Sequence, residues 1–381
     1  MTSPRRAAFG CVLAAMVVAA ALRPVAQSQD GRMSWDEVAP LFRPPPALEG
    51  QLGTFRSVMV FADGTPVKTA TDWPRRRAEI LAEWHGVMGE WPPLLAKVPM
   101  ETLSETHRET FTQRRVRLEV APGQRIEGWL LVPDGVTAGA ARTPAVLVPF
   151  YEPETSVGLG PRPQRDFARQ LTRAGFVTLS IGTPVGDARS PDRGIVTSQP
   201  LSYYAYVAAN AWTALAGLPY VDADRIGVVG HSYGGKWSMF AGAFWDRFAA
   251  VATSDPGIVF DESRPNVNYW EPWYLGFDPQ VRRQVGGLPA ADNPRTGAYK
   301  VMRARQMDLH ELHALIAPRP FFVSGGAEDP LTRWQALNHA VAVNRLLGRR
   351  DRVGMSTRPT HDPTPQSNAE MVAFFQHFLG R

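Results

Sequence analysis

The chain has 381 residues, of which 44% are hydrophobic and 20% are charged, and its formal net charge is +5. This balance is ordinary for a folded globular protein, so it excludes extended disorder and a protein with several membrane spans. The length suits one large α/β domain with insertions.

The first residues have the pattern of a secretory signal peptide. A pair of arginines precedes an apolar run over residues 7–22, and small polar residues follow near Ser28. Because this run is short for a membrane span, we predict that residues 1–28 are cleaved and that the mature protein is periplasmic or secreted, without a stable membrane partner. The only cysteine, Cys11, lies in this segment, so the mature chain is expected to have neither a disulfide nor a cysteine nucleophile.

Removal of residues 1–28 takes away three arginines and no acidic residue, so the formal net charge falls from +5 to +2. Such a charge lacks the strongly basic character that nucleic-acid-binding proteins use to contact phosphates. We therefore expect no nucleic-acid partner.

Residues 29–110 are expected to form a linker and a helical segment that packs on the main domain. Apolar side chains recur at helical spacing over residues 72–89, which predicts a helix there. Strands are predicted next, over residues 111–120, 125–132 and 143–148. A Pro-Asp-Gly turn at residues 133–135 separates the last two of these strands.

Strands and helices then alternate through the rest of a catalytic domain expected to span residues 111–381. Alternation of this kind builds a mostly parallel sheet with helices on both faces. The predicted strands cover residues 176–181, 226–229, 249–253, 319–324 and 353–356, and the predicted helices cover 164–174, 202–218, 235–244, 333–347 and 368–379. An irregular, aromatic-rich insertion follows the sixth predicted strand, at about residues 257–299, and long insertions of this kind are often functional.

Ser232 is the candidate nucleophile. It lies in the sequence Gly-His-Ser-Tyr-Gly, between a predicted apolar strand and a predicted helix, which is the setting that the GxSxG nucleophile elbow requires. Both flanking positions are glycine, as the sharp bend demands. The pattern therefore predicts an α/β-hydrolase fold with an exposed serine hydroxyl at the carboxyl end of the sheet.

A serine hydroxyl needs a general base, and the base needs an acid that orients it. In this fold class the order along the chain is serine, acid, histidine. His361 follows the last predicted strand and precedes the last helix, where the base is expected. The histidines at positions 310 and 313 lack the HExxH spacing, so no metal site is predicted and no cofactor is expected.

Three carboxylates are candidates for the acid. Asp329 and Glu328 follow the strand at 319–324, and Asp255 follows the strand at 249–253. Loop placement favours Asp329 and keeps Glu328 and Asp255 as alternatives.

The oxyanion of the reaction intermediate needs two backbone N–H donors. One is expected from Tyr233, directly after the serine, and the other from the loop after the strand at 143–148, near Tyr151. Lys236 lies one helical turn after Ser232, where the helix dipole disfavours a cation, so it is either a substrate contact or a side chain that extends to solvent. Trp270 and Glu271 lie among the insertion's aromatic residues, which would suit either a sugar ring or a lid fastened to the core.

Three segments, residues 221–232, 243–255 and 308–320, resemble bacterial α/β-hydrolases related to glucuronoyl esterases and acetyl xylan esterases, and the resemblance covers roughly residue 125 to the C-terminus. Glucuronoyl esterases cleave, without a metal, the ester that joins 4-O-methylglucuronic acid of xylan to lignin alcohols. The resemblance implies that Lys236 contacts the sugar and that Trp270 and Glu271 do likewise. It places the acid either at Asp255 or at Glu328 and Asp329. The family usually has arginine after the serine, where this chain has Tyr233.

The sequence therefore predicts an exported serine esterase, expected to be a monomer, that acts on an ester-decorated plant polysaccharide. Two other hypotheses remain. One is a peptidase of the prolyl-oligopeptidase type, although the N-terminal region is too short for a propeller. The other is a non-catalytic polysaccharide-binding module on a hydrolase scaffold.

Overall fold

A nine-stranded sheet runs through the protein. The computed structural model describes residues 1, 33–184, 188–190 and 193–380, so the predicted signal peptide, Met1 apart, lies outside the described residues. The strand order is β1-β2-β3-β5-β4-β6-β7-β8-β9. The strands are β1 (Met100–Arg108), β2 (Phe111–Ala121), β3 (Gln124–Pro133), β4 (Thr143–Pro149), β5 (Val177–Ile181), β6 (Val221–His231), β7 (Ala250–Ser254), β8 (Phe321–Ser324) and β9 (Val353–Ser356).

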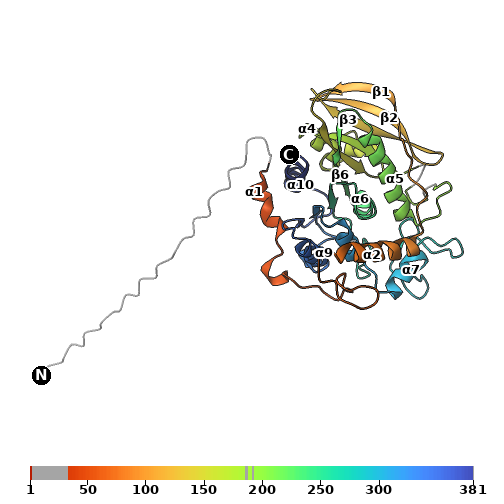
Figure 1. Ribbon diagram of the computed structural model, residues 1–381, viewed down its shortest axis with the longest axis vertical. Helices are drawn as coiled ribbons and strands as arrows, with labels where there is room; N and C mark the ends of the chain where they lie inside the picture. Colours follow the sequence, from red (N-terminus) through yellow and green to blue (C-terminus); the bar gives the residue numbers. More distant parts are fainter. Residues whose placement is uncertain (2–32, 185–187, 191–192, 381) are drawn as a thin grey trace.

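The sheet has an antiparallel end and a parallel body. Strands β1, β2, β3 and β5 pair antiparallel in that order, whereas β5, β4, β6, β7, β8 and β9 pair parallel. The antiparallel end stands away from the C-terminal helices in Figure 1. Because the parallel strands all point the same way, the loops after their carboxyl ends meet at one edge, where ligands bind in open α/β sheets.

Helices cover both faces of the sheet (Figure 1). One core lies beneath α2, α5, α6, α8 and α9, and the other beneath α1, α4 and α10. The α-helices are α1 (Trp35–Val38), α2 (Trp73–Met88), α3 (Pro153–Ser156), α4 (Phe167–Arg173), α5 (Pro200–Ala216), α6 (Tyr233–Phe244), α7 (Gly297–Ala304), α8 (His310–Ile316), α9 (Trp334–Leu346) and α10 (Pro365–Leu379). The described residues also form short 3-10 helices, which are η1 (Ala39–Phe42), η2 (Pro46–Leu48), η3 (Pro163–Arg165) and η4 (Leu331–Arg333).

The central strands are apolar because both of their faces are buried. In β4, Ala145 and Leu147 enter one core, while Val146 and Val148 enter the other. Alternate side chains of a strand point to opposite faces, so a strand covered on both sides reads as a continuous apolar run. The prediction of a mostly parallel sheet with helices on both faces is confirmed.

Some elements were not predicted. Strand β1 lies within residues 29–110, which the sequence assigned to linker and helix. It forms the outer edge of the sheet and its side chains are mostly exposed, so no alternation marks it. Helix α7 is amphipathic, but its first residues lie in the stretch that was interpreted as an irregular insertion. Helix α8 has seven residues, all of them buried, so no polar face marks it as a helix. The aromatic-rich insertion follows β7, which is the sixth of the predicted strands because β1 was missed.

The N-terminal segment packs against helices that come much later in the chain. Trp35 in α1 stacks on His377 in α10, with ring centroids 3.7 Å apart, and α2 packs against α7 and α8. Of the helices in the described part of the chain, none is both long and apolar enough to cross a bilayer.

Candidate active site

Ser232 occupies the strained elbow between β6 and α6. Its backbone has φ 53° and ψ −114°, a conformation that is rare for a residue other than glycine. A Cβ atom at Gly230 would lie 2.2 Å from the carbonyl oxygen of Gly234, and a Cβ at Gly234 would lie 2.1 Å from that of Pro149. The two glycines of the motif are therefore required by close backbone packing, and this packing holds the serine at the carboxyl edge of the sheet.

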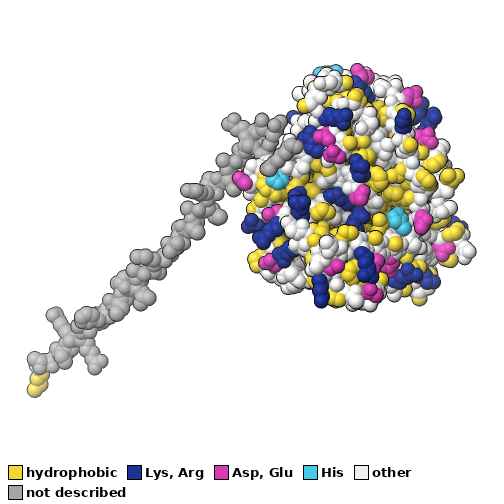
Figure 2. Space-filling view, in the orientation of Figure 1, with side chains coloured by type: hydrophobic (Ala, Val, Ile, Leu, Met, Phe, Trp, Pro, Cys, Tyr) yellow, Lys and Arg dark blue, Asp and Glu magenta, His cyan; other side chains and the backbone are white. Residues whose placement is uncertain are grey.

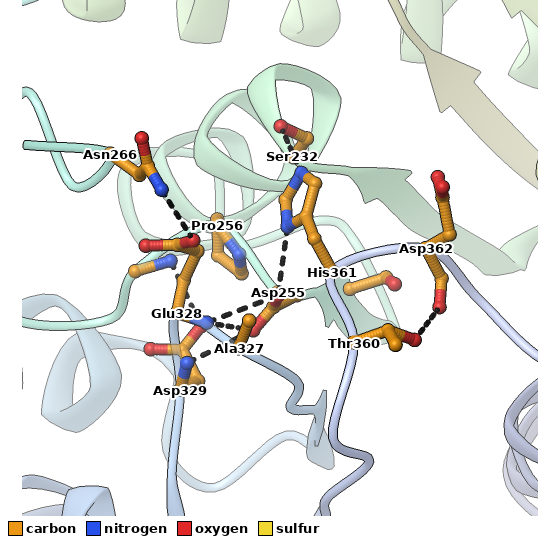
Figure 3. A network of polar contacts seen from close by, with 12 residues as sticks. Ser232, Asp255, Pro256, Asn266, Ala327, Glu328, Asp329, Thr360, His361 and Asp362 are labelled. Atoms are coloured by element: carbon orange, nitrogen blue, oxygen red, sulfur yellow. Dashed lines mark hydrogen bonds and ion pairs between the residues drawn. The ribbon is translucent and has the colours of Figure 1, made fainter.

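Ser232, His361 and Asp255 form a chain of hydrogen bonds, which Figure 3 shows from close by. The Oγ atom of Ser232 is 2.9 Å from Nε2 of His361, and Nδ1 of His361 is 2.8 Å from Oδ2 of Asp255. Both bonds form together when Nδ1 carries the proton and donates to Asp255, while Nε2 accepts from the serine. His361 is 34% exposed on its side chain and Asp255 is fully buried, so the base is accessible and its partner is shielded.

Asp329, the acid that loop placement favoured, is held elsewhere. Its carboxylate accepts hydrogen bonds from the N–H groups of Gly257, at 2.9 Å, and Ile258, at 2.7 Å. Its own N–H donates to Oδ1 of Asp255 at 2.9 Å. The partner of His361 is thus corrected to Asp255, the alternative residue. Both loops lie at the carboxyl edge of the sheet, so chain order could not distinguish them.

Glu328, the other alternative, also supports Asp255 through its backbone. Its N–H donates to both carboxylate oxygens of Asp255, at 3.0 and 3.2 Å, while its side chain accepts from the amide of Asn266 at 3.3 Å. Burial, and then the nearby charge of Asp255, raise the pKa of Asp329. The carboxylate of Asp255 thus accepts two backbone N–H groups, from Glu328 and Asp329, and one imidazole N–H, from His361.

Asp255, Glu328 and His361 bring together three side-chain groups of the kinds that can bind a metal ion. One ligand atom each from Asp255, Glu328 and His361 lie within 4.8 Å of one another. In the structure the imidazole and the Asp255 carboxylate of this cluster bind each other, as a base and its orienting acid do. The expectation that no metal takes part stays a prediction.

The two residues expected to supply the oxyanion donors lie side by side. Tyr233 begins α6 directly after Ser232, and Tyr151 follows β4 in the neighbouring loop. Their rings stack with centroids 4.3 Å apart and planes 16° apart. The hydroxyl of Tyr233 is 3.1 Å from that of Thr183, in the loop after β5. The stacked pair joins the elbow to the loop after β4.

Lys236 does not extend to solvent, so that alternative is wrong. Its side chain is buried, Nζ donates to the carbonyl oxygen of Pro256, and the rings of Tyr269 and Tyr274 lie 4.6 and 5.4 Å from Nζ. Burial lowers the pKa of Lys236 to about 8, against the opposing attraction of nearby carboxylates such as Asp329. A substrate contact for this lysine stays a prediction.

Trp270 and Glu271 anchor the insertion. Trp270 is fully buried and its Nε1 donates to the carbonyl oxygen of Gly287 at 2.8 Å. Glu271 is also buried and accepts from the N–H of Gly286 at 2.9 Å. Both hydrogen bonds join parts of the insertion to each other, and a sugar contact for these two residues stays a prediction. Trp273 lies nearer the elbow, since its ring stacks on that of Tyr233 at 6.0 Å.

Arg358 is a residue of the site that the sequence did not reveal. Its guanidinium donates to the carbonyl oxygens of His361, at 2.7 Å, and Asp362, at 2.8 Å. It also donates to both oxygens of Ser324, at 2.9 and 3.0 Å, and to the hydroxyl of Ser254 at 3.1 Å. Most of its acceptors are backbone groups, which leave no signature in a sequence.

Two further residues lie near the imidazole of His361 or its loop. The ring of His231 lies 4.7 Å from the ring of His361, and its Nδ1 is 3.1 Å from the hydroxyl of Ser254. Burial lowers the pKa of His231 well below its ordinary value, so this ring stays neutral. Arg165 donates from Nε to Asp362 at 2.9 Å, directly after the base in the chain. The His361 loop is thus held on both sides.

Comparisons with known proteins agree with this architecture. A sequence model described as the prolyl oligopeptidase family matches residues 207–294, which include the elbow. A carbohydrate esterase from an unknown prokaryotic organism is 25% identical over 248 residues, which are 54% of this chain and 54% of that protein. The matched part thus spans about half the length of this curated relative.

Solved structures of esterases superimpose on most of the chain. A glucuronoyl esterase from Solibacter usitatus has a TM-score of 0.65 at 20% identity and covers 85% of this chain and 97% of its own. A family 15 carbohydrate esterase, a glucuronoyl esterase from Teredinibacter turnerae, has a TM-score of 0.61 at 19% identity, with 88% and 92% covered. A proposed acetyl xylan esterase from Bacteroides fragilis has a TM-score of 0.53 at 15% identity, with 87% and 84% covered. The chain therefore has the α/β-hydrolase fold that these glucuronoyl and acetyl xylan esterases share.

Proposed function

We propose that this protein is a serine carboxylic-ester hydrolase that acts on an ester-decorated polysaccharide. One observation carries the proposal: Ser232, His361 and Asp255 form an unbroken hydrogen-bond chain, with distances of 2.9 and 2.8 Å, at the carboxyl edge of the sheet. A buried acid, an accessible base and a nucleophile on a strained elbow are the three parts that acyl transfer needs.

In the proposed reaction, Ser232 Oγ attacks the ester carbonyl carbon as its proton passes to His361 Nε2. The tetrahedral intermediate collapses, the C–O bond to the alcohol breaks, and the alcohol leaves with the proton from His361. Water then attacks the acyl-enzyme, gives a proton to the same nitrogen, and releases the acid while the proton returns to Ser232. Asp255 stabilises the imidazolium that forms at each stage.

The negative charge on the reacting oxygen is expected to be held by backbone N–H groups of Tyr233 and of the loop at Tyr151. Tyr233 is the first residue of α6, where the free N–H groups and the helix dipole favour an anion. Loss of a single oxyanion donor costs about 100-fold to 1,000-fold in turnover in other serine hydrolases.

The substrate class is supported by the relatives. The curated relative is a carbohydrate esterase, and the similar structures include glucuronoyl esterases and a proposed acetyl xylan esterase. We therefore propose a glucuronoyl or acetyl ester of plant polysaccharide as the substrate. The match of the prolyl oligopeptidase family model favours a peptidase as the second candidate.

A substrate screen separates these possibilities. Wild-type protein and Ser232→Ala are incubated with p-nitrophenyl acetate, acetylated xylan, benzyl glucuronate ester and a proline-containing peptide amide, and product is quantified. We expect ester hydrolysis that is lost in Ser232→Ala, by a factor of about 10⁴ or more. Hydrolysis of the amide alone would establish the peptidase, whereas activity unchanged by the substitution would refute the nucleophile.

We further propose export through a cleaved signal peptide at residues 1–28. Expression of the full chain in a bacterial host, with N-terminal sequencing of protein from the periplasm and medium, tests this. A mature form that begins near residue 29 is expected, and full-length protein confined to the cytoplasm would contradict it.

A further inference from the structure

A large groove lies between the N-terminal segment and helix α9. Its volume is 1190 Å³, and it is lined by residues 40–46, by α9 and by the loop over residues 348–352. Ser232, Asp255 and His361 lie outside this lining. We call residues 43–47 the strap and this cavity the strap groove. In Figure 1 the N-terminal segment runs from α1, beside α10, toward α9.

The strap is fastened at its first end by Phe42. This side chain is 4% exposed, and its ring stacks on Phe322 and Phe374 with centroids 5.8 and 6.0 Å away. Beneath it lies Gly354 of the edge strand β9, where a Cβ would come within 2.8 Å of the Phe42 ring. The missing side chain of Gly354 therefore lets Phe42 pack directly on β9.

The second end is fastened to α9 by hydrogen bonds. The amide of Asn338 donates to the carbonyl oxygens of Leu48, at 2.8 Å, and Gln51, at 2.7 Å. Between the two ends stand three consecutive prolines: Pro45 has φ −53° and ψ 142°, close to polyproline II, and Pro46 begins the 3-10 helix η2. The ring of each proline fixes its φ angle, which limits the freedom of the strap between its two anchors.

The groove is strongly basic. Five arginines and two carboxylates line it, which leaves a formal excess of three positive charges. The arginines come from three separate segments, the strap, α9 and the loop after it, and are Arg43, Arg345, Arg349, Arg350 and Arg352. One ion pair, between Arg345 and Glu49 at 3.1 Å, neutralises part of this charge.

The dipole of α9 explains only part of this arrangement. A cation such as Arg345 is favourable in the last turn of a helix. Arg43, however, projects from the strap on the opposite wall, where no helix end requires it. Partial burial and the charge of Arg349 lower the pKa of Arg352, whose guanidinium also lies 5.2 Å from the ring of Phe378. Like charges gathered on both walls of one groove raise its positive potential.

We propose that the strap groove binds an acidic, uronate-bearing polysaccharide chain, away from the site where the ester is cleaved. Guanidinium groups pair with carboxylates through two parallel hydrogen bonds, a geometry that lysine cannot supply. The groove's volume of 1190 Å³ exceeds the usual range of roughly 300 to 1,000 Å³ of a small-molecule pocket. A groove of this size can hold a ligand that is longer than one small molecule. The choice of a glycan rests on the proposed function, whereas the anionic character of the ligand rests on the groove alone.

Binding can be tested without catalysis. Full-length Ser232→Ala protein is titrated with polygalacturonate and with de-esterified glucuronoxylan by calorimetry, at low and at moderate salt. A second protein adds Arg349→Glu and Arg350→Glu, and a matched control adds Arg125→Glu and Arg142→Glu, two exposed arginines outside the groove lining. Both double substitutions change the net charge equally.

We expect the groove substitutions to weaken binding at least tenfold and the control substitutions to weaken it less than threefold. Binding should also fall as salt rises, because the contacts are between charges. Equal losses in the two variants, no binding at low salt, or equal binding of neutral xylohexaose would each overturn the proposal.

Two further titrations test whether the groove prefers another kind of anionic partner. Single-stranded DNA and phosphatidylglycerol vesicles are titrated in the same way, and groove-dependent binding of either that exceeds binding of the uronate polymers would overturn the glycan assignment. Introduced into the wild-type chain, the groove substitutions should leave hydrolysis of p-nitrophenyl acetate unchanged. Binding by a chain that hydrolyses no ester would refute the proposed function and retain the groove, so the two failures are distinguishable.

Discussion

Single residues decide whether Ser232 can act as a nucleophile. The motif glycines are recognisable in the sequence because a tight strand-to-helix bend tolerates nothing larger, and the base His361 is recognisable from its place after the last strand. The acid, in contrast, is not recognisable from the sequence. Asp255, Glu328 and Asp329 all follow parallel strands, and only side-chain directions show that Asp255 faces the imidazole.

Substitution of the carboxylates should separate their roles. We expect Asp255→Asn to lower kcat by about 10³ to 10⁴, because the imidazole loses the acceptor that fixes its tautomer. Asp329→Asn should lower kcat far less, since the backbone N–H of residue 329 still donates to Asp255. Steady-state kinetics with an activated ester measure both effects. A larger loss for Asp329→Asn would return the role of acid to that residue.

Arg358 is expected to position the His361 loop. Arg358→Met removes the guanidinium that donates to the carbonyl oxygens of His361 and Asp362, so the imidazole should lose its alignment and kcat for an activated ester should fall by about 10-fold to 100-fold. Arg358→Lys cannot supply the forked hydrogen bonds and should recover only part of this loss. Steady-state kinetics measure both variants. An unchanged kcat in Arg358→Met would contradict the role.

At the scale of elements, the hydrophobic period of the sequence predicted the positions of helices and strands reliably. Helix α2 and strands β2 to β5 lie within a few residues of their predicted bounds, because each buries a regular set of apolar positions. Strand β1 and helix α8 escaped prediction because an exposed edge strand and a fully buried short helix carry little periodic signal. Helix α7 was missed although it is amphipathic, because it lies at the end of a stretch interpreted as irregular. Helix α8 is instead defined by buried polar contacts, such as that of Trp84 Nε1 with Glu311 at 2.9 Å.

The histidines of α8 and α9 should make the fold sensitive to acid. Burial lowers the pKa of His313 to about 3, and it lowers the pKa of His310 and His339 as well. The unfolded chain therefore binds more protons than the folded chain below about pH 6.5, so stability falls as pH decreases through that value. Each histidine contributes a slope of up to about 1.4 kcal/mol per pH unit.

The comparison of His313→Leu with wild type isolates one of these contributions. Asp308, whose pKa burial raises to about 7, acts in the opposite direction between its ordinary pKa and that value, but it is present in both proteins. Urea unfolding at pH 4.5, 5.5 and 6.5 should show a shallower pH dependence for the variant. Parallel curves for the two proteins would refute the contribution of His313.

At the scale of the whole molecule, the N-terminal segment joins elements from both ends of the chain. It packs α1 on α10, it lays Phe42 on the edge strand β9, and it brings α2 against α7 and α8. On the face seen in Figure 2, acidic and basic side chains are interspersed, whereas the lining of the strap groove has five arginines and two carboxylates.

Phe42→Ala should destabilise the protein by about 3 to 5 kcal/mol, because it leaves a cavity between β9 and α10 and removes the anchor of the strap. Chemical unfolding monitored by tryptophan fluorescence measures the change. Ile195→Ala, at a side chain that is 72% exposed, serves as the control and should change stability by less than about 0.5 kcal/mol. Similar values for the two variants would mean that the segment is not integral to the fold.

The sequence by itself determined the fold class and predicted a candidate nucleophile and a candidate base, because each depends on a local pattern: hydrophobic period, glycine spacing and order along the chain. Tertiary structure alone decided the partner of His361, the burial of Lys236, Trp270 and Glu271, and the network of Arg358. These depend on distances between residues that are remote in sequence, such as the 106 positions that separate Asp255 from His361. Which of several loop carboxylates meets a histidine is set by the packing of neighbouring strand ends, and that packing has no counterpart in the linear order of residues.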